Sequence, residues 1–570
     1  MGGADDVASP GRADPASQGA TPEEDPRDSS ADVVEPSRTA LTTTTPGTPG
    51  GASEDEPGPL EWTEFPRPVA WAKTDPVAPP VSRGRDVVAT LGVVAVVVAA
   101  VPAAVLVLPD TSANVVDEAA RSLGLSSSGV ADLLRATGLS VPVLLAAVPV
   151  GAVAARRFGA RTVLALGVAL LVAGLLAVGR ADSVPLVGAV RAVQGVGAGL
   201  ILPATLVLAW ERGGRLAASL WSGALVASLV GAMPLALARV PLPDGAPGAG
   251  PVIDWRTALA PFPWSTAVLV IVLPFCLVMR GRRGRLPALR NPERGQLVLP
   301  LAPAAGFAFI AVVTTYGWSP GGRLVLAALA LLGLVGLAFV GSRDATAGSP
   351  LGAAVVLVTT GLLTYPVAAP LAGIAAVAAR DGGDASYRTY LPFAAGAGAA
   401  LVAAATAARL PRDAGRVAVL AGHALMVLAT LPALFTAAAH VPVSAHIPAV
   451  AAVTMAALGA GAGLALAVSL RYAGVAAALF GLSLCFPAVL TGQLVVLSLQ
   501  AGWLRPAPTT AEAQLAALTD GYRAWLGAAA VLVVLLAVAG RAAAPGRARA
   551  RAARREPDQS EPLGTVSTGR

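Results

Sequence analysis

Residues 185–209 read PLVGAVRAVQGVGAGLILPATLVLA, an apolar run with a single charged side chain, Arg191. A helix needs about 20 apolar residues to cross the hydrocarbon core of a bilayer, so this run predicts a transmembrane helix. Arg191 lies six residues inside the run, which is about 9 Å from its end at ~1.5 Å per residue. Because a charge in hydrocarbon is costly, this side chain must face a polar interior and is a candidate functional residue.

Runs of the same kind fill the chain from Asp86 onward, on both sides of this one. Their lengths fit a bilayer, and short loops separate most of them. We therefore predict an all-α polytopic membrane protein with fourteen transmembrane helices. The predicted spans are 87–108, 130–152, 161–179, 185–209, 214–239, 258–279, 297–317, 322–341, 351–379, 389–408, 414–437, 447–470, 473–500 and 521–540. Pro366 and Pro370 predict a kink or a break in the ninth span.

The composition agrees with a bilayer environment. Hydrophobic residues make up 55% of the chain and charged residues 13%, whereas soluble proteins carry about 25% charged residues. This excludes an ordinary soluble enzyme. Residues 1–85 differ from the rest because they are acidic and rich in Pro, Gly, Ser and Thr, which predicts a disordered cytoplasmic tail. Residues 542–570 form a second tail, which is basic and which we also expect to be disordered.

The arginines predict how the chain is oriented. With the N-terminus in the cytoplasm, the inner segments hold 24 arginines and the outer loops hold nine. Basic residues concentrate in cytoplasmic loops, so we expect both termini in the cytoplasm and a multi-pass protein of the plasma membrane. The arginines are scattered between apolar runs and do not line one face, which argues against nucleic-acid binding.

A few other polar side chains lie within the spans. Gln194 follows Arg191 by three residues. Asp132 and Arg135 in the second span are also three residues apart, so they share a helix face and can form an ion pair. That pair is either structural or a proton site, and His423 in the eleventh span is either a packed histidine or a proton relay. We take all five residues as candidates for the transport pathway.

Small residues follow Arg191 along the same span. Glycines at these positions let neighbouring helix backbones approach closely. Residues 195–199 read GVGAG, and Pro203 comes one turn later. In the fifth span, Gly231 continues a face of small residues and Pro234 predicts a kink. These positions predict tight helix packing.

The order of these residues resembles the major facilitator superfamily, and within it the branch of fourteen-span drug:proton antiporters. Residues 191–199, RAVQGVGAG, are similar to the family's fourth-span motif, and residues 151–161, GAVAARRFGAR, resemble its basic gating loop. Residues 254–256, DWR, are similar to the Trp-Arg signature of the branch, and residues 409–416 echo the gating loop in the second half. We expect gating and helix-packing roles for Gly151, Arg156, Arg157, Gly159, Arg161, Gly195, Gly197, Gly199, Gly231 and Pro234.

The resemblance implies the major facilitator fold in a 6+2+6 arrangement. Residues 86–279 would form the first six-helix bundle, and residues 351–541 the second. Between them, residues 280–350 would form a basic cytoplasmic loop and two extra transmembrane helices. Such a protein is expected to be a secondary transporter that works by alternating access between the two bundles.

The resemblance and the charges also imply a substrate class. We expect export of a small amphipathic molecule by a monomer that needs no cofactor and no metal. The spans hold a buried arginine and few acids, which favours a neutral or anionic substrate over a lipophilic cation. Residues 91–108 contain no acid, and neither does the gating loop. Proton coupling therefore stays open, with Asp132 and His423 as candidates.

Three other functions are compatible with the sequence. The first is a polytopic membrane enzyme, such as a lipid-linked glycosyltransferase, because Asp117 and Glu118 after the first span could bind a divalent cation through oxygen ligands. The second is a flippase for a lipid-linked precursor. The third is a degenerate facilitator without transport activity.

Overall fold

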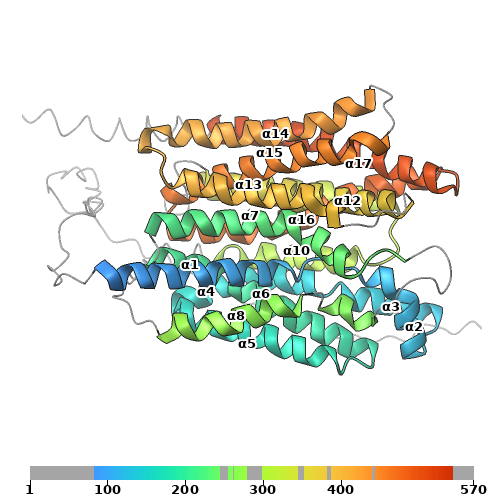
Figure 1. Ribbon diagram of the computed structural model, residues 1–570, viewed down its shortest axis with the longest axis horizontal. Helices are drawn as coiled ribbons and strands as arrows, with labels where there is room; N and C mark the ends of the chain where they lie inside the picture. Colours follow the sequence, from blue (N-terminus) through green and yellow to red (C-terminus); the bar gives the residue numbers. More distant parts are fainter. Residues whose placement is uncertain are drawn as a thin grey trace, which may run out of the picture. The chain divides into compact units, whose positions relative to one another are not determined.

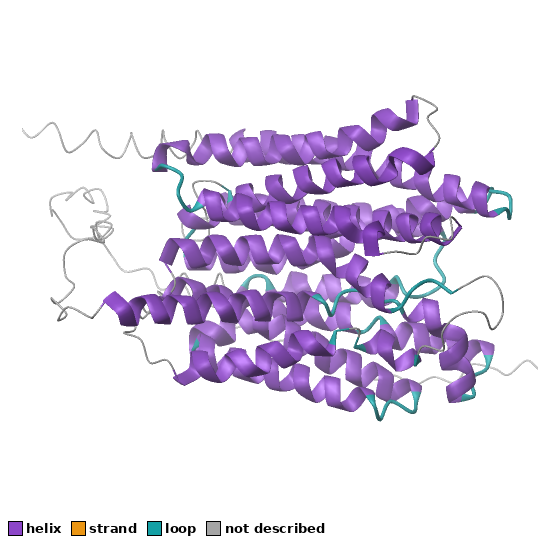
Figure 2. Ribbon diagram, viewed as in Figure 1, coloured by secondary structure: helices purple, strands orange, loops and turns teal. Residues whose placement is uncertain are grey.

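The computed structural model describes residues 83–212, 214–243, 254–260, 262–278, 298–343, 352–381, 387–438 and 443–542. The regular structure in these ranges is helical throughout (Figures 1 and 2). The predicted tails fall almost entirely outside the described residues, as does the basic loop at 280–297. The prediction of an all-α membrane protein is confirmed for the described part of the chain.

The helices follow the apolar runs of the sequence, except that the predicted span 130–152 is divided between α3 and α4 by a turn at residues 138–139. They are α1 (Arg83–Val105), α2 (Val116–Leu123), α3 (Ser127–Thr137), α4 (Ser140–Phe158), α5 (Ala160–Val178), α6 (Val184–Arg212), α7 (Gly214–Arg239), α8 (Pro263–Val278), α10 (Leu301–Val313), α11 (Pro320–Arg343), α12 (Ala353–Asp381), α13 (Leu391–Ala407), α14 (Gly415–Ala438), α15 (Val443–Tyr472), α16 (Val475–Leu504) and α17 (Ala511–Ala542). Short 3₁₀ turns accompany them: η1 (Ser112–Val115), η2 (Trp255–Leu259), η3 (Tyr387–Tyr390) and η4 (Arg412–Ala414).

Eleven stretches of helix in the described ranges are long and apolar enough to cross a membrane, and three shorter apolar helices accompany them. The shorter ones are Thr90–Val105, Pro263–Pro274 and Leu301–Val313. Each of the fourteen predicted runs overlaps one of these helices. Multiple crossings are thus supported, and the number fourteen stays a prediction.

Helix α6 packs closely against α4 and α5 because its glycines have no side chains. A Cβ atom at Gly195 would lie 2.5 Å from the carbonyl oxygen of Ser140, and one at Gly197 would lie 2.8 Å from that of Gly167. At Gly199 it would meet the Cβ of Ala147 at 2.5 Å. The predicted tight packing at these three glycines therefore has a physical basis in the structure.

The same G-x-G-x-G spacing recurs in α15, which packs against α13 and α14. A Cβ at Gly461 would lie 2.6 Å from the carbonyl oxygen of Gly422, and one at Gly463 would lie 2.5 Å from that of Ala400. Gly459 meets the backbone of Gly396 in the same way. The same close approach of helix backbones at three glycines therefore occurs in both halves of the chain.

Helix α7 connects the two halves, because it packs against α1 and also against α12, α13 and α15. The extra helices lie elsewhere: α10 packs on α4, and α11 packs on α16. One apolar core extends through these helices. Helix α12 is unbroken through Pro366 and Pro370, so the break considered above is absent. Membrane helices tolerate prolines because neighbouring helices satisfy the freed backbone groups.

Candidate functional site

Arg191 lies in the second turn of α6, and its side chain is almost fully buried, with 2% exposed. Its Nε donates to the carbonyl oxygen of Thr137 at 2.8 Å. Its Nη2 donates to the carbonyl oxygens of Val107 at 3.2 Å and Pro109 at 3.3 Å. The guanidinium thus joins α6 to the chain after α1 and to the end of α3.

These acceptors are available because helices end at both places. Helix α1 stops at Val105, and α3 stops at Thr137 just before α4 begins at Ser140. The last carbonyl groups of a helix have no intrahelical partner and carry the negative end of its dipole. The carbonyl of Thr137 is such a helix-end acceptor, whereas those of Val107 and Pro109 belong to the non-helical chain beyond the end of α1. Together they supply the charge-assisted hydrogen bonds that a buried guanidinium requires.

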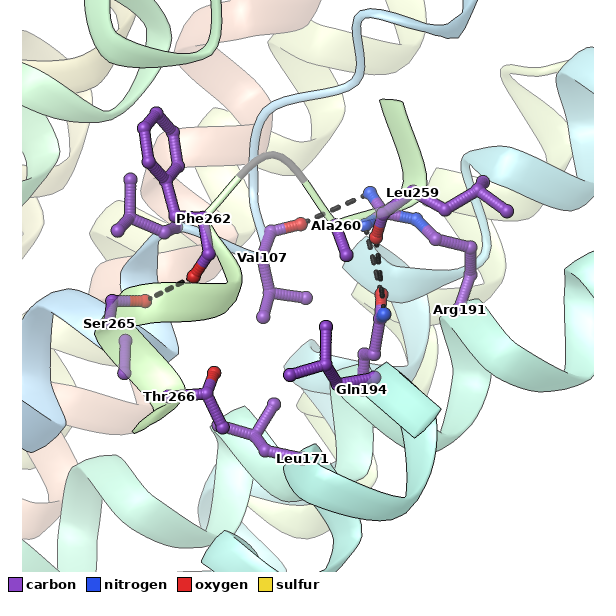
Figure 3. A pocket seen from close by; sticks show the side chains of 12 residues that line it. Val107, Leu171, Arg191, Gln194, Leu259, Ala260, Phe262, Ser265 and Thr266 are labelled. Atoms are coloured by element: carbon purple, nitrogen blue, oxygen red, sulfur yellow. Dashed lines mark hydrogen bonds between the residues drawn. The ribbon is translucent and has the colours of Figure 1, made fainter. Parts of the chain in front are cut away.

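Gln194 extends the cluster toward η2. Its Oε1 accepts from Arg191 Nη1 at 3.1 Å, and its Nε2 donates to the carbonyl oxygen of Leu259 at 3.1 Å. Asp254 caps η2 by accepting from the backbone N–H of Arg256 at 3.0 Å, and Trp255 is buried. The DWR segment therefore places Leu259 against Gln194 (Figure 3).

Asp110 is the acid that the sequence interpretation missed. Its Oδ1 accepts from Ser112 Oγ at 2.6 Å, and its Oδ2 accepts from Thr137 Oγ1 at 3.0 Å. The carboxylate lies within electrostatic range of Arg191, and so does the buried Tyr365 of α12. Asp110 escaped notice because it stands two residues beyond the first apolar run, where the chain has already left the helix.

A small cavity of about 40 Å³ lies beside Arg191 and Gln194. Leu171, Phe262 and Ser265 are among its lining residues, and Figure 3 shows Ser265 beside Phe262. A volume of this size holds ordered water and is too small for an amphipathic solute. The side chains around Arg191 and Gln194 are therefore closely packed, with room beside them for water only.

The other pathway candidates lie elsewhere. Asp132 and Arg135 form the expected ion pair, with Arg135 Nη1 2.6 Å from Asp132 Oδ1, but both side chains are substantially exposed in α3. His423 in α14 is buried, and its Nδ1 lies 2.8 Å from the carbonyl oxygen of Val419 in its own helix. Its Nε2 is buried without a hydrogen-bond partner. The structure brings Arg191 and Gln194 together and joins neither of them by hydrogen bonds to the other three.

The basic gating loop connects α4 to α5. A Cβ at Gly151 would lie 2.9 Å from the carbonyl oxygen of Gly199, so α4 and α6 touch there. Gly159 has φ +96°, a conformation that favours glycine, and it forms the turn between the helices. Arg156 and Arg161 lie within electrostatic range of Glu211 at the end of α6. Glu211 thus supplies the negative charge that the loop itself lacks.

The remaining predicted gating residues are less constrained. Arg157 is exposed at the end of α4, and its guanidinium carbon lies 5.5 Å from the ring centre of Phe158. A Cβ at Gly231 would meet only Leu235, at 3.9 Å, so α7 has no close helix contact at this glycine. Helix α7 continues through Pro234.

In the second half of the chain, α15 packs against its neighbours as α6 does, but it lacks side chains equivalent to Arg191 and Gln194. Aligning Gly459 with Gly195 places Met455 at the position of Arg191 and Leu458 at that of Gln194. Both of these apolar side chains are buried. Helix α15 therefore has no counterpart of Arg191 or Gln194 at these two positions.

The described residues hold no group of three or more His, Cys, Asp or Glu side chains that could bind a metal ion. Glu118 pairs with Arg121 at 2.6 Å. The acids Asp117 and Glu118 lie in the first turn of α2, which the helix dipole favours. These contacts give both acids a structural explanation.

Among the solved structures that are similar to the chain, three transporters each cover about four fifths of it. A bacterial homologue of the human drug peptide transporters PepT1 and PepT2 has 17% identity and a TM-score of 0.50, over 81% of this chain and 99% of that one. The human organic anion transporter MFSD10 has 15% identity and a TM-score of 0.46, over 79% and 99%. The proton:xylose symporter XylE has 15% identity and a TM-score of 0.45, over 82% and 97%.

No family model and no curated sequence matches the chain. The likeness to the peptide transporter homologue, together with the helix order, establishes the major facilitator fold. At these identities the likeness concerns the fold alone, so activity and substrate must be argued from the site.

Proposed function

We propose that the chain is a secondary transporter of the major facilitator type that exports a small amphipathic molecule by alternating access. The observation that carries this proposal is the burial of Arg191 and Gln194 in a polar cluster within an apolar helical protein. Two six-helix bundles, 86–279 and 351–541, would rock against each other while the helices of 297–341 pack outside. No chemical reaction is part of the proposal.

In this account Arg191 holds together the segments that meet at the N-terminal end of α6. It holds the chain after α1, the α3–α4 junction and, through Gln194, the η2 turn. All of these segments belong to the first bundle, so a rearrangement within that bundle would separate them and free the donors of Arg191 and Gln194. A substrate that enters can then take the place of the backbone carbonyls, and its departure restores the closed cluster.

The charge of the cluster selects the substrate class. A guanidinium offers forked donors that match a carboxylate, a phosphate or a sulfonate. Apolar side chains such as Leu171 and Phe262 would accept the rest of an amphipathic molecule. A neutral or anionic amphiphile therefore fits the site better than a lipophilic cation, which Arg191 would repel.

Asp110 supplies a route for proton coupling besides Asp132 and His423. Its carboxylate accepts three hydrogen bonds as an anion, two from Ser112 and one from Thr137, whose carbonyl binds Arg191. Protonation of Asp110 would weaken these contacts and loosen the same junction that Arg191 holds. A proton taken up by Asp110 would thus favour opening of this end.

Reconstitution into liposomes tests the proposal. Three dyes of similar size, one anionic, one uncharged and one cationic, are offered under an imposed pH gradient. We expect transport of the anionic or uncharged dye by the wild-type protein and at least a tenfold loss in Arg191→Ala, because one charged hydrogen bond contributes about 1.5–3 kcal/mol.

An exposed arginine provides the matched control. Arg505 follows α16 and is exposed, so Arg505→Ala should transport like the wild type. Transport restricted to the cationic dye and unaffected by Arg191→Ala would contradict the proposed site. Activity that depends on Asp117 and a divalent cation, with Arg191→Ala intact, would favour the membrane-enzyme alternative instead.

A further inference from the structure

A second and larger cavity lies away from the Arg191 cluster. It has a volume of about 580 Å³ and is formed by α3, the first turns of α4 and α6, and the end of α10. Binding pockets for small molecules span roughly 300–1,000 Å³, so this cavity can hold one. Its walls are mainly apolar, with Pro142, Val184, Ala192 and Val312 among the lining residues.

One end of this side cavity carries opposite charges. Asp132 and Arg135 both line it and form an ion pair at 2.6 Å. The Nε of Arg135 is buried and has no hydrogen-bond partner, and 38% of the arginine side chain is exposed. That Nε is out of a ligand's reach, but the exposed parts of both side chains, 38% of Arg135 and 59% of Asp132, leave donors and acceptors for a ligand that carries both charges.

The aromatic residues beside the pair mark a membrane interface. The guanidinium carbon of Arg135 lies 4.9 Å from the ring centre of Tyr316, which lines the cavity. Tyr316 and Trp318 follow α10, and both are exposed, as is Phe309 within the helix. Tyr and Trp gather where acyl chains meet head groups. From these aromatic residues we infer head-group depth for the charged end of the cavity and acyl-chain depth for its apolar walls.

We propose that the side cavity binds a bilayer phospholipid with a zwitterionic ethanolamine head group. The phosphate accepts from Arg135, the ammonium donates to Asp132, and one acyl chain lies against α4, α6 and α10. A purely anionic lipid would gain the contact with Arg135 but would meet the uncompensated carboxylate of Asp132. The head group with both charges satisfies both side chains.

The site also reaches the junction that carries Arg191. Ala136 and Gly138 line the side cavity, and Thr137 between them accepts the hydrogen bond from Arg191. A lipid held against this junction restrains it. The binding itself is independent of transport, so it can be tested whether or not the proposed function holds.

Native mass spectrometry of the full chain provides the test, after exchange into mixtures of phosphatidylethanolamine and phosphatidylglycerol of equal acyl composition. We expect the wild type to retain phosphatidylethanolamine preferentially. Arg135→Ala should lower that retention about tenfold, the loss expected for one charge-assisted hydrogen bond. Asp132→Asn should remove the preference and bring the two lipids to similar retention.

Two controls separate this site from general lipid contact. Glu118 and Arg121 form an equivalent ion pair at 2.6 Å on α2 outside the cavity, so Arg121→Ala should leave retention unchanged. Ala189 is exposed and lines the cavity, so Ala189→Trp should block it without entering the core, whereas Ala169→Trp on exposed α5 surface should not. Equal retention of both lipids by the wild type, or retention unaffected by Arg135→Ala and Ala189→Trp, would overturn the proposal.

Discussion

Arg191 donates from Nε to the backbone carbonyl of Thr137 at 2.8 Å, and the hydroxyl of the same threonine donates to Asp110. One residue at the α3–α4 junction thus connects a buried cation to a carboxylate that lies after α1. Because these contacts join three segments of the first half, movement of α6 relative to the junction must disturb both charged groups together.

The first prediction concerns the shape of the guanidinium. Lysine carries one compact charge and cannot reproduce the forked donors that reach Thr137, Val107 and Gln194. Arg191→Lys should therefore lower the free energy of unfolding by roughly 1–3 kcal/mol, because buried acceptors lose their donors. Thermal unfolding in detergent measures this, with Arg505→Lys as the control. An unchanged midpoint in Arg191→Lys would show that the cluster contributes little.

The second prediction concerns Asp110. Asparagine keeps an acceptor for Thr137 but has no carboxylate to protonate. Asp110→Asn should therefore abolish transport driven by a pH gradient and leave exchange between equal pH values in place. The exposed Asp182 provides the control variant, Asp182→Asn. If Asp110→Asn still transports under a pH gradient, Asp110 is not the coupling site. Asp132 and His423 would then be tested by the same assay.

The third prediction compares Gly195 and Gly231, two helix glycines for which the sequence predicts the same tight packing. Gly195→Ala would place a Cβ 2.5 Å from the carbonyl oxygen of Ser140, whereas Gly231→Ala would meet only Leu235 at 3.9 Å. The first should destabilise the protein by about 1–3 kcal/mol through overpacking. The second should be neutral or stabilise by up to ~1 kcal/mol, since alanine favours helix over glycine. Equal thermal midpoints for the two variants would contradict the packing described for α6.

The fourth prediction tests the role of Glu211 at the opposite end of α6. Removing its charge in Glu211→Gln should release the loop that carries Arg156 and Arg161. Trypsin should then cleave after Arg156 or Arg157 several-fold faster than in the wild type. The control is Glu512→Gln, at an exposed acid on α17, which should leave the cleavage rate unchanged. A wild-type cleavage rate in Glu211→Gln would show that Glu211 does not hold the gating loop.

Much of the fold could be predicted because the bilayer imposes a simple pattern. Spans must be apolar and about 20 residues long, so each predicted run overlaps a helix. The spacing of Arg191 and Gln194 also placed both on one helix face. The GAGAG segment at 459–463 repeats the GVGAG of 195–199, so a comparison of the chain with itself would have found the second packing site.

The rest of the site depends on contacts that periodicity does not encode. Asp110 lies after a helix end, and its proximity to Arg191 follows from the path of the chain beyond Val105. Glu211 finds its basic partners in a loop about fifty residues earlier. Gly231 has the same local sequence character as the α6 glycines, yet no helix approaches it. Only the assembled helices distinguish these cases.

The central claim is that the Arg191 cluster holds one end of the helices closed. Electron paramagnetic resonance distances test it directly, with spin labels at Ser183→Cys and Gln514→Cys at this end and at Thr162→Cys and Thr406→Cys at the opposite end. All four positions are exposed, and Cys276 and Cys485 are replaced by alanine. We predict that Arg191→Ala lengthens the 183–514 distance and shortens the 162–406 distance. Identical distributions in the wild type and Arg191→Ala would contradict the account.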